Sequence, residues 1–253
     1  SEARIRFSVI GINHGHIHAQ ISALLRGGGQ FVSYFAAEAD LAQAFSKQYP
    51  QAQQVSSVNK ILEDLSIQLI ASAAIPSERA GIGVAAMRHG KDFMVDKPGF
   101  TTPAQLEEAR RVQAETGRIY SVCYCERLSH PATVRAGELV QVGAVGRVIQ
   151  TVGLGPHRLN ASSRPAWFFQ RARCGGILAD IGSHQVDQFL FFTGAVEAEI
   201  TLAQVANLNH PEYPELEDWG EIALSAPGAA GYIRVDWFTP DGLGTWGDGR
   251  LFV

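Results

Sequence analysis

The first half of the sequence alternates short apolar segments with segments whose apolar residues recur at helical spacing. Residues 6–10 are largely apolar and end at Gly11, as a buried strand does. Ile17, Ile21 and Leu24 then fall on one helical face. Strands separated by helices with short connections pair in parallel, with right-handed crossovers, and bind ligands at their carboxyl ends. The pattern predicts an α/β doubly wound parallel sheet, with further strands at 31–35, 67–74, 92–95 and 119–125.

The rhythm changes beyond about residue 125. Strand-like segments now follow one another through loops, which is typical of a mainly antiparallel sheet in an α+β domain. We therefore expect an α/β domain over residues 1–122 and an α+β domain over residues 123–253. The second domain is predicted to have helices at 133–141 and 182–192 and strands at 146–154, 199–205, 220–225 and 230–237.

Composition narrows the class of protein. Of 253 residues, 46% are hydrophobic and only 18% charged, which supports a sizeable core and excludes a disordered chain. The net charge of -4 argues against a broad nucleic-acid surface, and no apolar run approaches the ~18 residues of a membrane span. Cys123, Cys125 and Cys174 are too few for a disulfide framework, so we expect a cytoplasmic protein. An export signal removed before Ser1 would leave no trace in this sequence.

The turn after the first strand reads Gly11-Ile12-Asn13-His14-Gly15-His16. A dinucleotide-binding fingerprint has glycine at the first, third and sixth places, and only Gly11 matches. Asn13 tolerates left-handed backbone, and Gly15 could supply the close approach to a phosphate at the helix N-terminus. A tight turn without a ligand is the alternative interpretation.

An acidic residue about 20 positions beyond the glycines would hydrogen-bond a ribose. Ala36 occupies the position that aligns, and Glu38 lies two places further on. Glu38 could make this contact, or the contact could be absent, which leaves the choice between NAD and NADP open.

Two later motifs are more specific. In Asp96-Lys97-Pro98, the proline keeps the lysine out of helical geometry, so that its ammonium can project from the sheet edge toward a substrate hydroxyl. An ordinary surface lysine is the alternative. In the segment 174–187, Asp180 and His184 are four residues apart and would share one helical face. A carboxylate beside an imidazole raises its pKa and makes it a candidate general base, whereas a helix cap with a polar histidine at a domain seam is the alternative.

Taken in this order, these motifs resemble the Gfo/Idh/MocA oxidoreductase family, to which glucose–fructose oxidoreductase and inositol 2-dehydrogenase belong. The resemblance spans essentially the whole chain. Ile75-Pro76 keeps the family's proline, and Asp96 stands where the family usually has glutamate.

The resemblance implies hydride transfer between NAD or NADP and a sugar, polyol or related hydroxy compound. Lys97 would bind the reacting oxygen, His184 would be the acid/base, and Asp180 its partner. Residues 1–122 would form a dinucleotide-binding Rossmann domain. Residues 123–253 would form a domain that binds substrate and makes oligomer contacts, and this second domain would be cut short at its C-terminus. The implied cofactor-binding residues are Gly11, Asn13, His14, Gly15, His16, Glu38, Ile75, Pro76 and Lys97, and the implied substrate-binding residues are Lys97, His157, Trp167, Arg171, Asp180 and His184.

No metal is predicted. His14, His16 and His18 alternate, and on a helix they would point in three directions, while no Cys/His spacing supports another site. We expect a small-molecule sugar or polyol partner, no nucleic acid, no membrane, and a homo-oligomer (dimer or tetramer) formed through the open face of the second sheet. Two other functions remain open: transient use of NAD for elimination or glycoside cleavage, and a non-catalytic ligand sensor.

Overall fold

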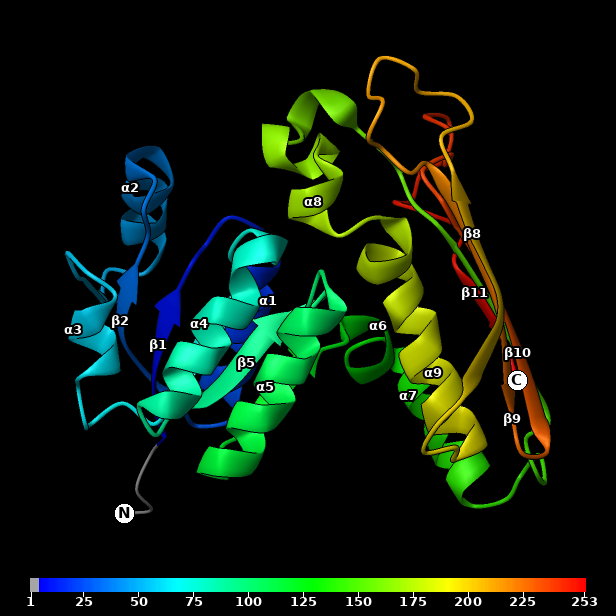
Figure 1. Cartoon of the computed structure of the whole chain (residues 1–253), viewed down its shortest axis with the longest axis horizontal. Helices are drawn as coiled ribbons and strands as arrows, with labels where there is room; N and C mark the ends of the chain where they lie inside the picture. The colour runs from blue at the N-terminus through cyan, green and yellow to red at the C-terminus, as the bar shows by residue number, and fades with distance from the viewer. Residues whose placement is uncertain (1–4) are drawn as a thin grey trace. The chain divides into compact units, whose positions relative to one another are not determined.

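The computed structural model describes residues 5–253 and contains two compact units (Figure 1). The first ends at Cys123 and the second begins at Tyr124.

The first unit contains a parallel sheet with helices on both faces, as the sequence predicts. Among the described residues the sheet has six strands in the order β3-β2-β1-β4-β5-β6, so the order reverses between β1 and β4. The strands are β1 (Arg6–Ile10), β2 (Gln30–Phe35), β3 (Gln53–Gln54), β4 (Leu69–Ser72), β5 (Asp92–Asp96) and β6 (Tyr120–Cys123). The helices are α1 (His16–Arg26), α2 (Ala39–Gln48), α3 (Asn59–Leu62), α4 (Pro76–Arg88) and α5 (Pro103–Thr116). The sequence predicts neither β3 nor α3, because elements this short show no periodicity.

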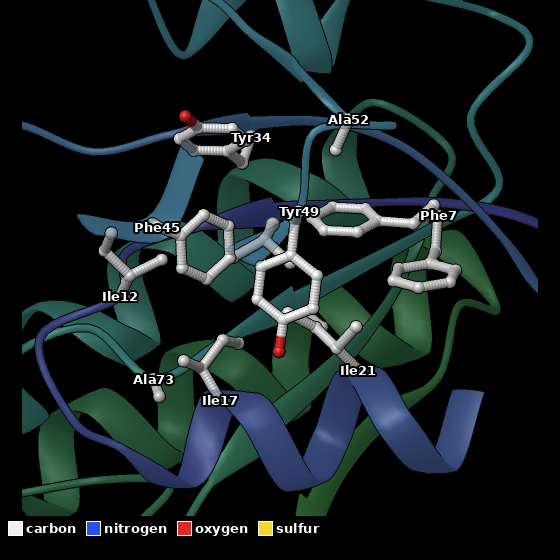
Figure 2. Packing of buried hydrophobic residues seen from close by; sticks show 12 residues of the cluster. Phe7, Ile12, Ile17, Ile21, Tyr34, Phe45, Tyr49, Ala52 and Ala73 are labelled. Carbon is white, nitrogen blue, oxygen red and sulfur yellow. The ribbon is translucent and has the colours of Figure 1, made fainter. Parts of the chain in front are cut away.

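One face of this sheet packs against α1 and α2 (Figure 2). Ile17 and Ile21, which the helical spacing places on one face of α1, are fully enclosed. Phe7 of β1 stacks on Phe31 of β2, with ring centroids 5.0 Å apart. Burying each such side chain contributes roughly 1.5–3 kcal/mol to folding. The apolar positions of the sequence therefore predict which face of α1 packs on the sheet.

The opposite face packs against α4, which approaches the sheet through small residues (Figure 1). A Cβ added at Gly83 would lie 2.4 Å from the ring of Tyr120 and 2.5 Å from that of Phe93. The close approach matters for the site, because α4 begins at Pro76 beside the end of β4.

We expect Gly83→Ala to lower the free energy of unfolding by about 1–3 kcal/mol, because the two aromatic rings must shift to admit the methyl group. Gly81→Ala is the matched control on the same helix, since nothing lies within 4 Å of its added Cβ. This change is expected to raise stability by up to about 1 kcal/mol through helix propensity. Urea unfolding measures both, and a Gly83→Ala protein as stable as Gly81→Ala would contradict the packing described here.

The second unit contains a mainly antiparallel sheet in the order β11-β7-β10-β9-β8 among the described residues, with β7 and β10 the parallel pair. Helix α9 runs along one face of it (Figure 1). Glycines in the strands admit α9, since an added Cβ at Gly153 or Gly231 would meet Gln185 or Phe189. The strands are β7 (Gln150–Pro156), β8 (Glu199–Ala206), β9 (Trp219–Ala226), β10 (Ala229–Asp236) and β11 (Arg250–Phe252). The helices are α6 (Cys125–Leu128), α7 (Pro131–Gln141), α8 (Arg171–Cys174) and α9 (Ser183–Thr193), with two 3-10 turns at Ala161–Ser163 and Ala166–Phe169.

Between residues 5 and 253, no helix combines the length and the apolar character that crossing a membrane requires.

Candidate functional site

The turn after β1 lies where the strand order reverses, and Gly11 makes it possible. Its φ of +86° is in the left-handed region, and an added Cβ would lie 2.4 Å from the Cβ of Ala74. The Gly11 amide donates to the carbonyl of Phe35 at the end of β2, and its own carbonyl accepts from Ala73 after β4. The residue that matches the fingerprint therefore joins the carboxyl ends of three neighbouring strands.

The structure brings several predicted cofactor residues together at this edge. Asn13 Nδ2 donates to Glu38 Oε1 at 2.8 Å, so the turn after β1 meets the start of α2. Gly15 precedes α1 and has open space where a Cβ would be, which suits close approach of a ligand to the helix N-terminus. Ile75 and Pro76 lie at the start of α4, next to Ala73, whose carbonyl accepts from the His14 amide at 3.0 Å.

Two histidines of the turn approach one carboxylate. His16 Nδ1 lies 2.9 Å from Asp96 Oδ1, and His14 Nδ1 lies 3.3 Å from Asp96 Oδ2. The argument that the three histidines would point in different directions is wrong for this pair, because α1 begins only at His16 and His14 lies in the turn before it. Their ring centroids are 4.2 Å apart. His18 does turn away, with Nδ1 2.8 Å from the hydroxyl of Tyr49.

A buried arginine forms hydrogen bonds with the backbone of the lysine motif, residues 96–98. Arg79 of α4 is 1% exposed, and its Nη1 donates to the carbonyls of all three residues Asp96, Lys97 and Pro98. Its Nη2 donates to Asp96 Oδ2 at 3.2 Å. The Lys97–Pro98 peptide is cis, and Lys97 is buried. The guanidinium therefore fixes the backbone on both sides of Lys97.

These partners set the charge of Asp96. Burial alone would raise the pKa of this carboxyl, but the hydrogen bond from His16 and the positive charge of Arg79 outweigh burial and hold the pKa well below its usual range. Asp96 is thus a carboxylate across the working pH range, at the carboxyl end of β5.

In the second unit, Asp180 and His184 lie on successive helical segments. Asp180 belongs to a π-helical turn, Leu178–Gly182, and His184 to the first turn of α9. His184 is buried, with its ring 5.9 Å from that of Tyr124 in an edge-to-face arrangement. Sequence reasoning expects an ordinary helical start here and gives no sign of the π turn.

Arg164 is a further group near Asp180 that the sequence does not single out as a site residue. Its guanidinium lies over the rings of Phe168 and Trp237, 4.5 and 5.2 Å from their centroids. Burial lowers the pKa of Arg164, and the negative charge of Asp180 opposes this shift. The faces of these aromatic rings explain why a guanidinium is held here. Nothing in the sequence pattern, however, distinguishes Arg164 from the neighbouring arginines.

The other predicted substrate residues lie in the same unit in distinct environments. His157 Nε2 lies 3.7 Å from Glu126 Oε1, and its Nδ1 3.1 Å from the carbonyl of Gly155. Trp167 is buried against Phe168. Arg171 Nε is 2.6 Å from Glu217 Oε1, so its guanidinium already has a carboxylate partner. Their roles in substrate binding stay predictions.

A doubly wound sheet with a glycine turn at the strand reversal defines the class of dinucleotide-binding α/β proteins. A model of the oxidoreductase family with an NAD-binding Rossmann fold matches residues 5–124, and a model of the GFO/IDH/MocA C-terminal domain matches residues 133–251. The chain belongs to the Gfo/Idh/MocA oxidoreductase family. The resemblance drawn from the motifs is confirmed, and the family's NAD-binding domain agrees with the predicted nicotinamide cofactor.

Two relatives named as dehydrogenases are each 26% identical to this chain over the residues that align. Levoglucosan dehydrogenase of Pseudarthrobacter phenanthrenivorans is 26% identical over 79% of this chain and 52% of its own length. The NADP-dependent scyllo-inositol 2-dehydrogenase of Bacillus subtilis is 26% identical over 70% of this chain and 49% of its own. The chain thus spans about half the length of these two relatives.

A solved structure from Erwinia carotovora atroseptica SCRI1043, provisionally described as an oxidoreductase, is more similar. It is 46% identical, with a TM-score of 0.95 over 98% of this chain and 74% of that one. Levoglucosan dehydrogenase in complex with NADH, 20% identical with a TM-score of 0.82 over 98% of this chain and 70% of that one, shows the same fold.

Proposed function

We propose that this chain transfers a hydride between a nicotinamide cofactor and a sugar, polyol or related hydroxy compound. The observation that carries the proposal is the buried turn at Lys97, which Arg79 holds at the same sheet edge as the Gly11 turn. Ligands of doubly wound sheets bind at this edge. The relatives named for levoglucosan and scyllo-inositol support a polyhydroxy substrate.

The residues at this edge fit a dinucleotide. Gly11 permits the turn, Gly15 leaves the N-terminus of α1 open, and helix N-terminal amides favour phosphate. The proposed cofactor contacts are Gly11, Asn13, His14, Gly15, His16, Glu38, Ile75, Pro76 and Lys97. When bound, the nicotinamide supplies the hydride chemistry, and the protein supplies position and proton transfer.

The proposed catalytic residues handle the hydroxyl proton. The Lys97 ammonium holds the reacting oxygen, and the His184 imidazole takes or returns the proton, with Asp180 favouring its charged form. In this proposal the first unit binds the dinucleotide, and the second binds substrate through His157, Trp167, Arg171, Asp180 and His184.

Glu38 leads us to expect NAD in preference to NADP. A carboxylate accepts a hydrogen bond from the ribose 2′-hydroxyl and repels a 2′-phosphate. In the full chain, NADH is therefore expected to bind more tightly than NADPH, and Glu38→Gln to weaken NADH binding by about tenfold, which corresponds to one lost charge-assisted hydrogen bond. Glutamine keeps the acceptor that Asn13 needs, so only the charge is tested.

Energy transfer from tryptophan to the reduced nicotinamide measures this binding. Asp40→Asn, an exposed change in the first turn of α2 just after Glu38, is the matched control and should leave the affinity unchanged. Tighter binding of NADPH than of NADH would contradict the role of Glu38. If the chain bound none of NAD⁺, NADH, NADP⁺ and NADPH saturably, the proposed oxidoreductase would be overturned and a ligand sensor favoured.

Turnover then separates the two enzymatic alternatives. An oxidoreductase reduces added NAD in proportion to the sugar or polyol consumed, whereas elimination or glycoside cleavage with transient NAD leaves no net NADH.

The proposed location is cytoplasmic, and the proposed assembly is a homo-oligomer through the open face of the second sheet. Leu202 of β8, opposite Ala223 of β9, exposes an apolar side chain on this face, and light scattering decides between this assembly and a monomer.

A further inference from the structure

We propose that His14, His16 and Asp96 bind a borderline transition-metal ion such as Zn²⁺. Among the described residues, these three form the group whose imidazole and carboxylate atoms all lie within 4.8 Å of one another. The site goes beyond the proposed hydride transfer, which requires no metal.

The spacing of the donor atoms suits a tetrahedral ion. Bonds of about 2.0–2.2 Å to nitrogen and oxygen place neighbouring ligand atoms about 3.3–3.5 Å apart. The two recorded separations from Asp96, 2.9 Å to His16 Nδ1 and 3.3 Å to His14 Nδ1, are close to this range. We expect side-chain rotations to place all three donors around one ion, with a fourth position left for water.

Ligation would replace hydrogen bonds that these donor atoms make in the structure. The backbone amide of His16 donates to His14 Nδ1 at 3.2 Å, so this nitrogen is an acceptor that carries a lone pair. A bound ion would take this lone pair in place of the amide. Metal binding needs neutral imidazole and a deprotonated carboxyl, so an ion would displace the proton that His16 Nδ1 and Asp96 Oδ1 share across 2.9 Å.

The surroundings hold the ligands in place. Asp96 ends β5, His16 begins α1, and the His14 amide is tied to the Ala73 carbonyl, so each ligand is on a fixed backbone. Arg79 bonds Asp96 Oδ2 and leaves Oδ1 toward His16, as outer partners of metal-ligating carboxylates do.

Access and donor type determine which ions can bind. The side chains of His14 and His16 are 26% and 41% exposed, whereas Asp96 is 3% exposed, so an ion enters from the histidine side. Two imidazoles among three ligands favour Zn²⁺, Cu²⁺ or Ni²⁺ over Mg²⁺ or Ca²⁺. The positive charges of Arg79 and Lys97 near Asp96 weaken the binding of any cation, so we expect a site that loads reversibly and is not permanently filled.

Calorimetric titration of the chelator-treated full chain with Zn²⁺ tests the proposal. We expect one ion per chain, and a loss of affinity of at least about tenfold in His14→Gln and in His16→Gln, since even an outer partner is worth about that much. His18→Gln is the matched control on the same helix, because His18 bonds Tyr49 instead of Asp96. Thermal unfolding of each variant confirms that it is folded.

Cu²⁺ provides a second readout. Coupling to two imidazole nitrogens in the electron paramagnetic resonance spectrum is expected for the native chain and coupling to one in either variant. No Zn²⁺ binding by the native chain, or binding that both His14→Gln and His16→Gln retain, would overturn the site. Because His14 and His16 are also proposed cofactor contacts, we expect Zn²⁺ and NADH to compete, and this expectation rests on the proposed function. A chain that binds Zn²⁺ but neither form of NAD or NADP therefore refutes the proposed function and leaves the metal site standing.

Discussion

Replacing Arg79 by leucine is expected to lower the free energy of unfolding by roughly 3–5 kcal/mol, the usual result of removing one partner from a buried ion pair. The change leaves Asp96 charged and buried, and leaves the carbonyls of Asp96, Lys97 and Pro98 without their shared donor. Urea unfolding at neutral pH measures the loss. Arg79→Lys keeps the charge but cannot reach all of these acceptors at once, so an intermediate loss is expected.

Arg88→Leu is the matched control for Arg79→Leu, because Arg88 lies on the same helix with a 49% exposed side chain, 3.7 Å from Glu108. Such surface pairs contribute about 0–1 kcal/mol. The pH dependence adds a second check. Because the pKa of Asp96 is lowered in the folded protein, its ionised carboxyl contributes stability at pH values above the usual aspartate range. This stability is lost as the pH falls below about 4 toward the folded pKa. A loss for Arg79→Leu no greater than that for Arg88→Leu would contradict the role assigned to Arg79.

Lys97→Met is expected to lower kcat/KM by about 10²–10⁴-fold, the usual contribution of a positioned proton-transfer group. Methionine is similar in length and keeps the buried position filled, while the proton and the charge are lost. Because Arg79 holds the backbone of this turn through the Lys97 carbonyl, the turn itself should be unchanged. Steady-state kinetics with the sugar or polyol that proves active gives the ratio.

Lys60→Met, at an exposed position of α3, is the control for removing a positive charge and should leave kcat/KM unchanged. NADH affinity in Lys97→Met distinguishes a loss of chemistry from a loss of cofactor. A variant that binds NADH as the native chain does and still turns over at full rate would show that Lys97 handles no proton.

The sequence predicts the elements whose side chains follow a period or whose ends carry a cap. Thr102, followed by Pro103 and three residues on by Gln105, predicts a capped helix start, and Gly117 predicts the helix end. In the structure Thr102 accepts from the Gln105 amide at 3.3 Å, and Gly117 has a φ of +67°. The fingerprint predicts a glycine turn at Gly11, and this residue has the left-handed backbone conformation that requires glycine. These predictions succeed because each depends on local chemistry within a few residues.

The candidate site is predicted less completely because it depends on distant contacts. Arg79 follows Pro76 on an otherwise ordinary helix, and only the fold shows that the carbonyls around Lys97 lie within its reach. The sequence predicts the wrong direction for the His14 side chain because one residue separates the turn from α1. The start of a helix is uncertain by that amount from sequence alone. The π turn around Asp180 likewise has no periodic signature of its own.

The departures from the glycine fingerprint have a consequence for anyone who redesigns this chain. Restoring glycine at Asn13 and His16 would recreate the common motif in sequence, but it would remove the amide that bonds Glu38 and the imidazole that bonds Asp96. The turn after β1 and the lysine turn share one carboxylate, so neither can be transplanted from a relative without the other. Residues 11–16 and 96–98 would have to be transferred together, along with Glu38 and Arg79, which they bond.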